Sequence, residues 1–88
     1  MRRFEPITFD VEIHPEVWRQ IAVVPSEVFR ALQRGMAESA ERLARAAEAG
    51  ADLETKVTVP LEGYEALCEV RPEERLLRLV RISRTSEG

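Results

Sequence analysis

The feature that most constrains this chain is its hydrophobic period, which changes from two residues to about 3.6 and back to two. Apolar and polar side chains alternate without a break over residues 7–13. This alternation predicts a half-buried strand. His14 and Pro15 end the run, because proline cannot donate to a sheet and suits the first turn of a helix.

Helical spacing follows in two segments. The first covers residues 15–23, where Val17, Trp18 and Ile21 recur at helical intervals. The second covers residues 26–49 after a break at Val24-Pro25-Ser26. Its apolar stripe consists of Phe29, Leu32, Met36, Ala40, Leu43 and Ala47. So short a connection predicts an antiparallel helical hairpin.

Period-two patterns return at residues 56–61 and 64–70, and a third run, rich in Leu, Val and Ile, follows at residues 75–83. Pro60 marks the first of these as an edge strand or the site of a bulge. In the second run, Cys68 alternates onto the inward face. The last run has apolar residues on both faces, which predicts a central strand. Its arginines recur every third residue and fit neither period, so a short helix is the alternative there.

The expected fold is therefore α+β, in the order β-α-α-β-β-β, with a helical hairpin packed on a small, mainly antiparallel sheet. The chain has 88 residues, which predicts a single domain over 1–88 with flexible ends at 1–6 and 85–88. No apolar run approaches the ~20 residues of a membrane span, and no signal peptide is recognised. With its single cysteine, Cys68, the sequence predicts a protein of the reducing cytoplasm.

Charge is distributed unevenly along the sequence. The formal net charge is −3, which argues against coating of nucleic acid through bulk charge. Acidic residues dominate positions 4–17, whereas arginines dominate positions 71–84. The basic segment has two interpretations of equal weight: a functional basic patch, or a charged surface that protects the sheet against edge-to-edge pairing.

Three stretches resemble the RelE/ParE superfamily of bacterial toxins. Residues 9–16 look like the family's first strand running into its first helix. Residues 18–43, interrupted at Val24-Pro25-Ser26-Glu27, are similar to its helical hairpin. Residues 63–70 and 76–84 look like its closing hairpin, which commonly ends in a basic dipeptide. The resemblance covers nearly the whole chain.

The resemblance implies a toxin of a type II toxin–antitoxin module, neutralised by an antitoxin that wraps over it. The RelE branch enters the ribosomal A site and cuts mRNA, and the ParE branch acts on DNA gyrase. A basic cleavage site would come from Lys56, Tyr64, Arg81 and Arg84, with Arg75 and Arg78 binding nucleic acid or a partner. Three positions depart from the family's usual residues: Glu65, Cys68 and Ser83.

Cleavage through the RNA 2′-hydroxyl needs a base, an acid and positive charge on the phosphate. Arginine meets the charge requirement but is a poor proton-transfer group. The candidates for proton transfer are Lys56, Tyr64 and His14; for His14 a packed residue at the strand–helix boundary is the favoured interpretation, and for Tyr64 a residue at the core edge. One histidine and one cysteine far apart predict no metal site, and no cofactor motif is present.

Two hypotheses of other classes stand beside the toxin. One is a non-catalytic module that keeps the fold and binds a protein partner, and the other is an unrelated small α+β domain. If the chain is an enzyme, we expect Lys56, Arg81 and Arg84 to converge with Tyr64 in one concave basic site. If it is a binding module, we expect these residues to be scattered and an apolar groove to be exposed.

Overall fold

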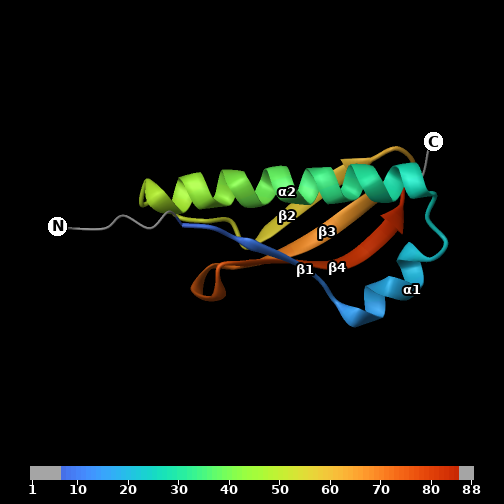
Figure 1. Ribbon diagram of the computed structural model, residues 1–88, viewed down its shortest axis with the longest axis horizontal. Helices are drawn as coiled ribbons and strands as arrows, with labels where there is room; N and C mark the ends of the chain where they lie inside the picture. The colour runs from blue at the N-terminus through green and yellow to red at the C-terminus, as the bar shows by residue number, and fades with distance from the viewer. Residues whose placement is uncertain (1–6, 86–88) are drawn as a thin grey trace.

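The computed structural model describes residues 7–85. Its elements are β1 (Asp10–Ile13), α1 (Trp18–Ile21), α2 (Ser26–Glu48), β2 (Lys56–Leu61), β3 (Tyr64–Arg71) and β4 (Leu76–Arg84), with 3₁₀ turns at Pro15–Val17 and Pro72–Glu74. The ends predicted to be flexible, except Thr85, lie outside the described residues. Figure 1 shows α2 lying along the sheet.

The strands form one sheet in the order β1-β4-β3-β2. β4 pairs antiparallel with β3 and parallel with β1, and β2 pairs antiparallel with β3. The predicted α+β class and order of elements are therefore confirmed, as is the central position of the last strand. Pro60 lies in the edge strand β2, where a missing N–H is tolerated. The alternative of a short helix at residues 75–83 is wrong.

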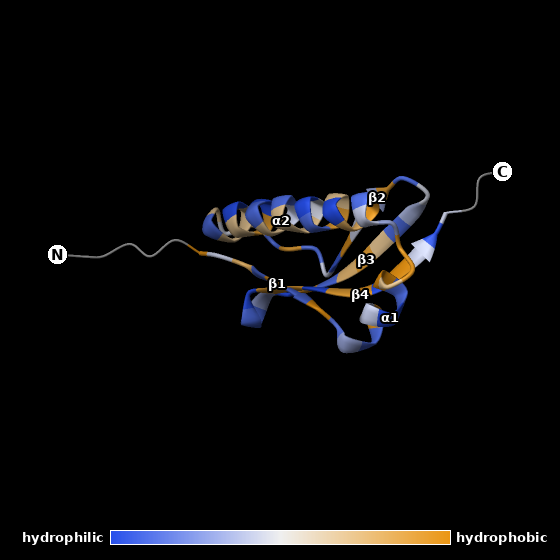
Figure 2. Ribbon diagram, turned by 45° about the vertical axis from the view of Figure 1, so that its right-hand side comes forward, coloured by the Kyte–Doolittle hydropathy of each residue, from blue (hydrophilic) through white to orange (hydrophobic). Residues whose placement is uncertain are grey.

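α2 covers one face of the sheet, and the hydrophobic core lies between them. The core joins Leu32, Met36 and Leu43 of α2 to alternate residues of β2, β3 and β4. Figure 2 shows α2 on one side of the sheet, whereas α1 lies beside β4 on the other side. Gly35 brings α2 close to the edge strand, because a Cβ built there would lie 2.6 Å from Cγ1 of Val59. Gly35 therefore packs closely against the sheet.

The segment before α2 is shorter and less regular than predicted. The first strand spans four residues rather than seven, and the first helix is a 3₁₀ turn followed by a single α-turn. The two helices of the hairpin therefore differ in length, and α1 is too short to cover the sheet. Its contact with α2 includes the rings of Trp18 and Phe29, whose centroids lie 6.4 Å apart. Among the described residues, no helix is long and apolar enough to cross a bilayer.

The start of β4 also differs from the prediction. Arg75 has a φ of 52°, in the left-handed region, and ends the turn Pro72–Glu74 instead of opening the strand. A left-handed residue cannot continue an extended ladder, so the strand begins at Leu76. Arg75 therefore lies at the turn, remote along β4 from Arg81 and Arg84.

Candidate functional site

The two faces of the sheet carry different side chains. The face under α2, here the covered face, holds the buried residues of the strands, among them Val57, Ala66, Cys68, Leu77 and Leu79. The opposite face, here the open face, holds the residues that alternate with them. Lys56, Glu69, Arg78 and Glu12 are consecutive register partners across all four strands of this face. A row of alternating charge therefore crosses the open face.

One pair of this row is in direct contact. Nε of Arg78 donates to Oε1 of Glu12 at 2.6 Å, and the Arg78 side chain is only 25% exposed. Because Glu12 engages the Arg78 guanidinium, Arg78 offers less free positive charge to a ligand than its position suggests. No such ion pair is found for Arg75 among residues 7–85.

A β-bulge at Val80 explains the spacing of the arginines. Cys68 is the register partner of Leu79 and Leu67 is that of Arg81, which leaves Val80 without a partner. The extra residue reverses the alternation, so Arg78 and Arg81 both belong to the open face although they are three residues apart. It also returns Ile82 to the covered face, where it is 9% exposed.

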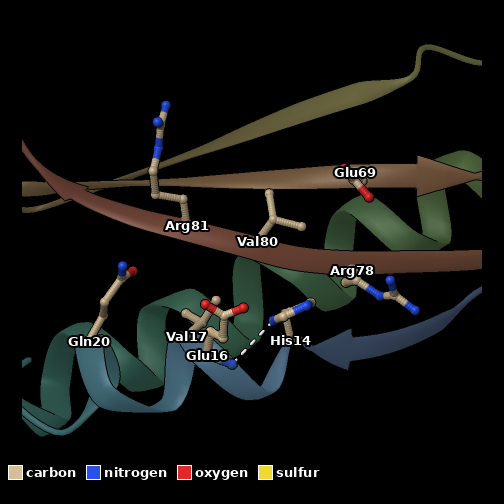
Figure 3. A pocket seen from close by; sticks show the side chains of 8 residues that line it. All are labelled: His14, Glu16, Val17, Gln20, Glu69, Arg78, Val80 and Arg81. Carbon is tan, nitrogen blue, oxygen red and sulfur yellow. Dashed lines mark hydrogen bonds between the residues drawn. The ribbon is translucent and has the colours of Figure 1, made fainter.

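A groove lies between α1 and β4 on the open face (Figure 3). Its volume is about 430 Å³, and its lining residues are His14, Glu16, Val17, Gln20, Glu69, Arg78, Val80 and Arg81. One wall, here called the α1 wall, is formed by His14, Glu16, Val17 and Gln20 of the segment that leads into and includes α1. β3 and β4 supply the other wall. In Figure 3, Arg81 and Arg78 leave β4 in different directions, with Val80 between them. The groove thus combines guanidinium, carboxylate, imidazole and amide groups over an apolar floor.

Two side chains of the α1 wall have fixed hydrogen bonds. Nδ1 of His14 accepts from the Glu16 backbone N–H at 3.1 Å and so caps the 3₁₀ turn. In neutral imidazole this places the remaining proton on Nε2. Oε1 of Gln20 accepts from the Ile82 backbone N–H at 2.8 Å. Val17 is buried and anchors the wall between these two residues.

The structure brings only some of the predicted site residues together. Arg81 lines the groove with Arg78, and Lys56 belongs to the open face but lies in the edge strand, where its register partner is Glu69. Tyr64 packs against the core on the covered face and is the partner of Arg84. Neither these two nor Lys56 lines the groove that holds Arg81. The single concave basic site expected of an enzyme is not formed by these four residues.

Sequence reasoning missed the α1 wall of the groove. In the sequence, His14 is a candidate for proton transfer whose favoured interpretation is a packed residue at the strand–helix boundary, and Glu16 and Gln20 match no motif. The sequence predicts the end of the first strand at Ile13, but it carries no signal for the parallel register of β1 with β4. A strand that ends at Ile13 pairs with β4 only as far as Leu79, so the residues after it run beside the rest of β4.

Charge on the open face is balanced. Alternation places Lys56, Arg71, Arg78 and Arg81 there beside Asp10, Glu12, Glu65 and Glu69. An RNA-binding surface is expected to carry excess positive charge. Within residues 7–85, no cluster of histidine, cysteine and carboxylate side chains is suited to hold a metal ion.

Cys68 lies outside the groove, within the core. Its side chain is fully buried on the covered face, as predicted, and it forms no disulfide. Burial disfavours the thiolate and raises the pKa of the Cys68 thiol from 9.0 to about 11. A thiol with so high a pKa is not a nucleophile at neutral pH.

Comparison with protein-family models and with curated protein sequences gives no match. Among solved structures, the crystal structure of the isolated E. coli RelE toxin is similar, with a TM-score of 0.61. The similarity covers 91% of this chain and 87% of that one, at 11% sequence identity. At this identity the likeness concerns the path of the chain. The protein described here therefore has a RelE-like toxin fold.

Proposed function

We propose that this chain is the toxin component of a type II toxin–antitoxin pair and that a protein antitoxin neutralises it. The observation that carries the proposal is the RelE-like fold, which extends over 91% of the chain. The groove between α1 and β4 is the surface through which we expect it to contact its target. Arg81 is exposed there and has no ion-pair partner among the described residues, so its planar fork is available to a phosphate or a carboxylate.

Binding of the target, rather than RNA cleavage, is the mode of action that the groove supports better. Glu12 engages Arg78, and Glu16 and Glu69 add negative charge beside Arg81. This mixture of charges suits a protein surface with both signs better than a polyanion. Tyr64 and Arg84, which the family resemblance assigned to catalysis, belong to the covered face of the sheet.

Growth of a bacterial host after induced expression tests the proposal. The wild-type chain is expected to stop growth, and Arg81→Ala is expected to restore plating at least tenfold. Arg30→Ala is the matched control, because Arg30 is an exposed arginine of α2 that does not line the groove. Its effect should equal that of the wild type. Harmless expression of the folded wild-type chain would contradict the proposal.

The proposed antitoxin has its own test. A short open reading frame beside the gene should encode a protein that restores growth when it is co-expressed and that co-purifies with this chain. If neither neighbouring gene restores growth, the antitoxin is removed from the proposal. Toxicity is still tested by the growth experiment.

Ribosome-dependent mRNA cleavage is the second candidate. The presence of His14 and Glu16 in the groove that holds Arg81 favours it, because an imidazole and a carboxylate are proton-transfer groups. Glu16→Gln preserves the size of the side chain but cannot accept a proton. If the chain cleaves mRNA, this variant should lose both growth inhibition and the cut ends seen by primer extension on cellular mRNA. If the chain acts by binding, Glu16→Gln should remain toxic and no cut ends should accumulate with either protein.

A further inference from the structure

We infer that Gln20 is a positioning residue that holds α1 against β4 and so fixes the groove in which Arg81 lies. The effect of Gln20 on toxicity rests on the proposed function of the groove. Its effect on the position of β4 does not depend on that function. It follows from where the support of β4 changes along the strand.

β4 loses its parallel neighbour halfway along. β1 pairs with β4 from Leu76 to Leu79, and the His14 backbone N–H donates to the Leu79 carbonyl at 3.0 Å as the chain leaves the sheet. Beyond that point, within residues 7–85, β3 is the only strand paired with β4. The backbone groups on the other side of β4 then belong to a free strand edge.

The bulge lies at this same point. Val80 has no register partner on β3, and a bulge locally disrupts the ladder. Arg81 follows directly, so the residue proposed to meet the target is attached to an irregular segment with a strand on one side only. Such segments open more readily than a fully paired strand.

Gln20 supplies the missing support. Its Oε1 accepts from the Ile82 N–H at 2.8 Å, across 62 residues of sequence. Ile82 is buried on the covered face, so its backbone position is fixed by the core. The bond therefore ties the α1 wall to a rigid point, one residue beyond Arg81. Gln20 and Arg81 line opposite walls of the groove, and the bond sets their separation.

The Gln20 amide suits this role in a way that its neighbours do not. Arg19 lacks an acceptor, and Ile21 packs against the core. A glutamate at position 20 would keep an acceptor of the same length, whereas a methionine would keep the length and lose the acceptor. This pair of substitutions separates the hydrogen bond from packing.

Amide hydrogen exchange followed by NMR tests the bond directly. In Gln20→Met the Ile82 amide should exchange about tenfold faster, because it loses its acceptor. Exchange of the Ala66 and Cys68 amides within β3 should be unchanged. Gln20→Glu should restore slow exchange at Ile82. Gln33→Met is the matched control, since Gln33 is exposed on α2 and has no such bond among the described residues.

Growth inhibition supplies the functional arm. Gln20→Met should lower inhibition in the same direction as Arg81→Ala, and Gln20→Glu should recover it. Unchanged exchange at Ile82 in Gln20→Met would overturn the inference whatever the function. Faster exchange with undiminished toxicity would overturn the positioning role and leave the bond purely structural. If the wild type is harmless, the proposed function fails, and the exchange experiment still decides whether Gln20 holds β4.

Discussion

The covered and open faces of the sheet are made by the same strands, yet they differ in what fixes their side chains. On the covered face, Leu77 and Leu79 are 0% exposed and pack under α2. On the open face, charged residues of neighbouring strands are in register, and the Arg78–Glu12 ion pair is exposed in part. Burial of apolar area stabilises the first face, whereas the partly exposed charges of the second contribute little to stability.

The largest expected difference between the faces concerns leucine truncation. Leu79→Ala should lower the free energy of unfolding by about 2–5 kcal/mol, because it leaves a cavity under α2. Leu67→Ala, on the open face where the side chain is half-buried, should cost about 1 kcal/mol or less. Urea unfolding of both variants measures the difference. Equal losses would show that the open face is packed as tightly as the covered one.

The next effect tests the exclusion of water from the covered face. The Cys68 thiol has its pKa raised from 9.0 to about 11, so above pH 9 the unfolded chain releases a proton that the folded chain retains. Stability should therefore fall as pH rises from 9 to 11, by up to about 3 kcal/mol. Cys68→Ala lacks this thiol, and its unfolding free energy should show a smaller decrease over the same range. Parallel curves for the two proteins would contradict the buried, neutral thiol.

The smallest effect belongs to the open face. A double-mutant cycle on Glu12→Gln and Arg78→Met should give a coupling of about 0.5–1 kcal/mol, reduced in high salt because the pair is partly exposed. The Arg42–Glu54 pair, with both side chains about half exposed, is the control and should couple more weakly. Urea unfolding of the four proteins of each cycle measures both terms. A coupling of several kcal/mol at Arg78 would mean that the open face also contributes to stability.

Much of the fold could be predicted because alternation and helical spacing are local signals. The predicted bounds of β2 agree with the structure at both ends. The predicted bounds of β3 and β4 differ from the observed ones by no more than one residue at each end. The first helix was overestimated because apolar residues continue through Val23 and Val24, where the chain already turns toward α2. Period alone does not distinguish an apolar turn from the end of a helix.

The candidate site was predicted less well, for a reason that lies in the register. The resemblance placed Tyr64 with Arg81 in one site. Their faces depend on whether β4 is regular, and period-two alternation alone does not place the bulge at Val80. The three-residue spacing of Arg78 and Arg81 was the trace of that bulge. The α1 wall with Gln20 depends on the parallel register of β1 with β4, which tertiary pairing determines rather than local pattern.

The parallel pairing of β1 with β4 has a consequence for the order of events during synthesis. Glu12 and Arg78, which meet across these strands, are separated by 66 residues, so β1 can find its place only after β4 has emerged from the ribosome. A nascent or truncated chain without β4 lacks the strand between β1 and β3 and most of one wall of the groove. A host that makes this protein would thus encounter the complete groove only after β4 has been synthesised.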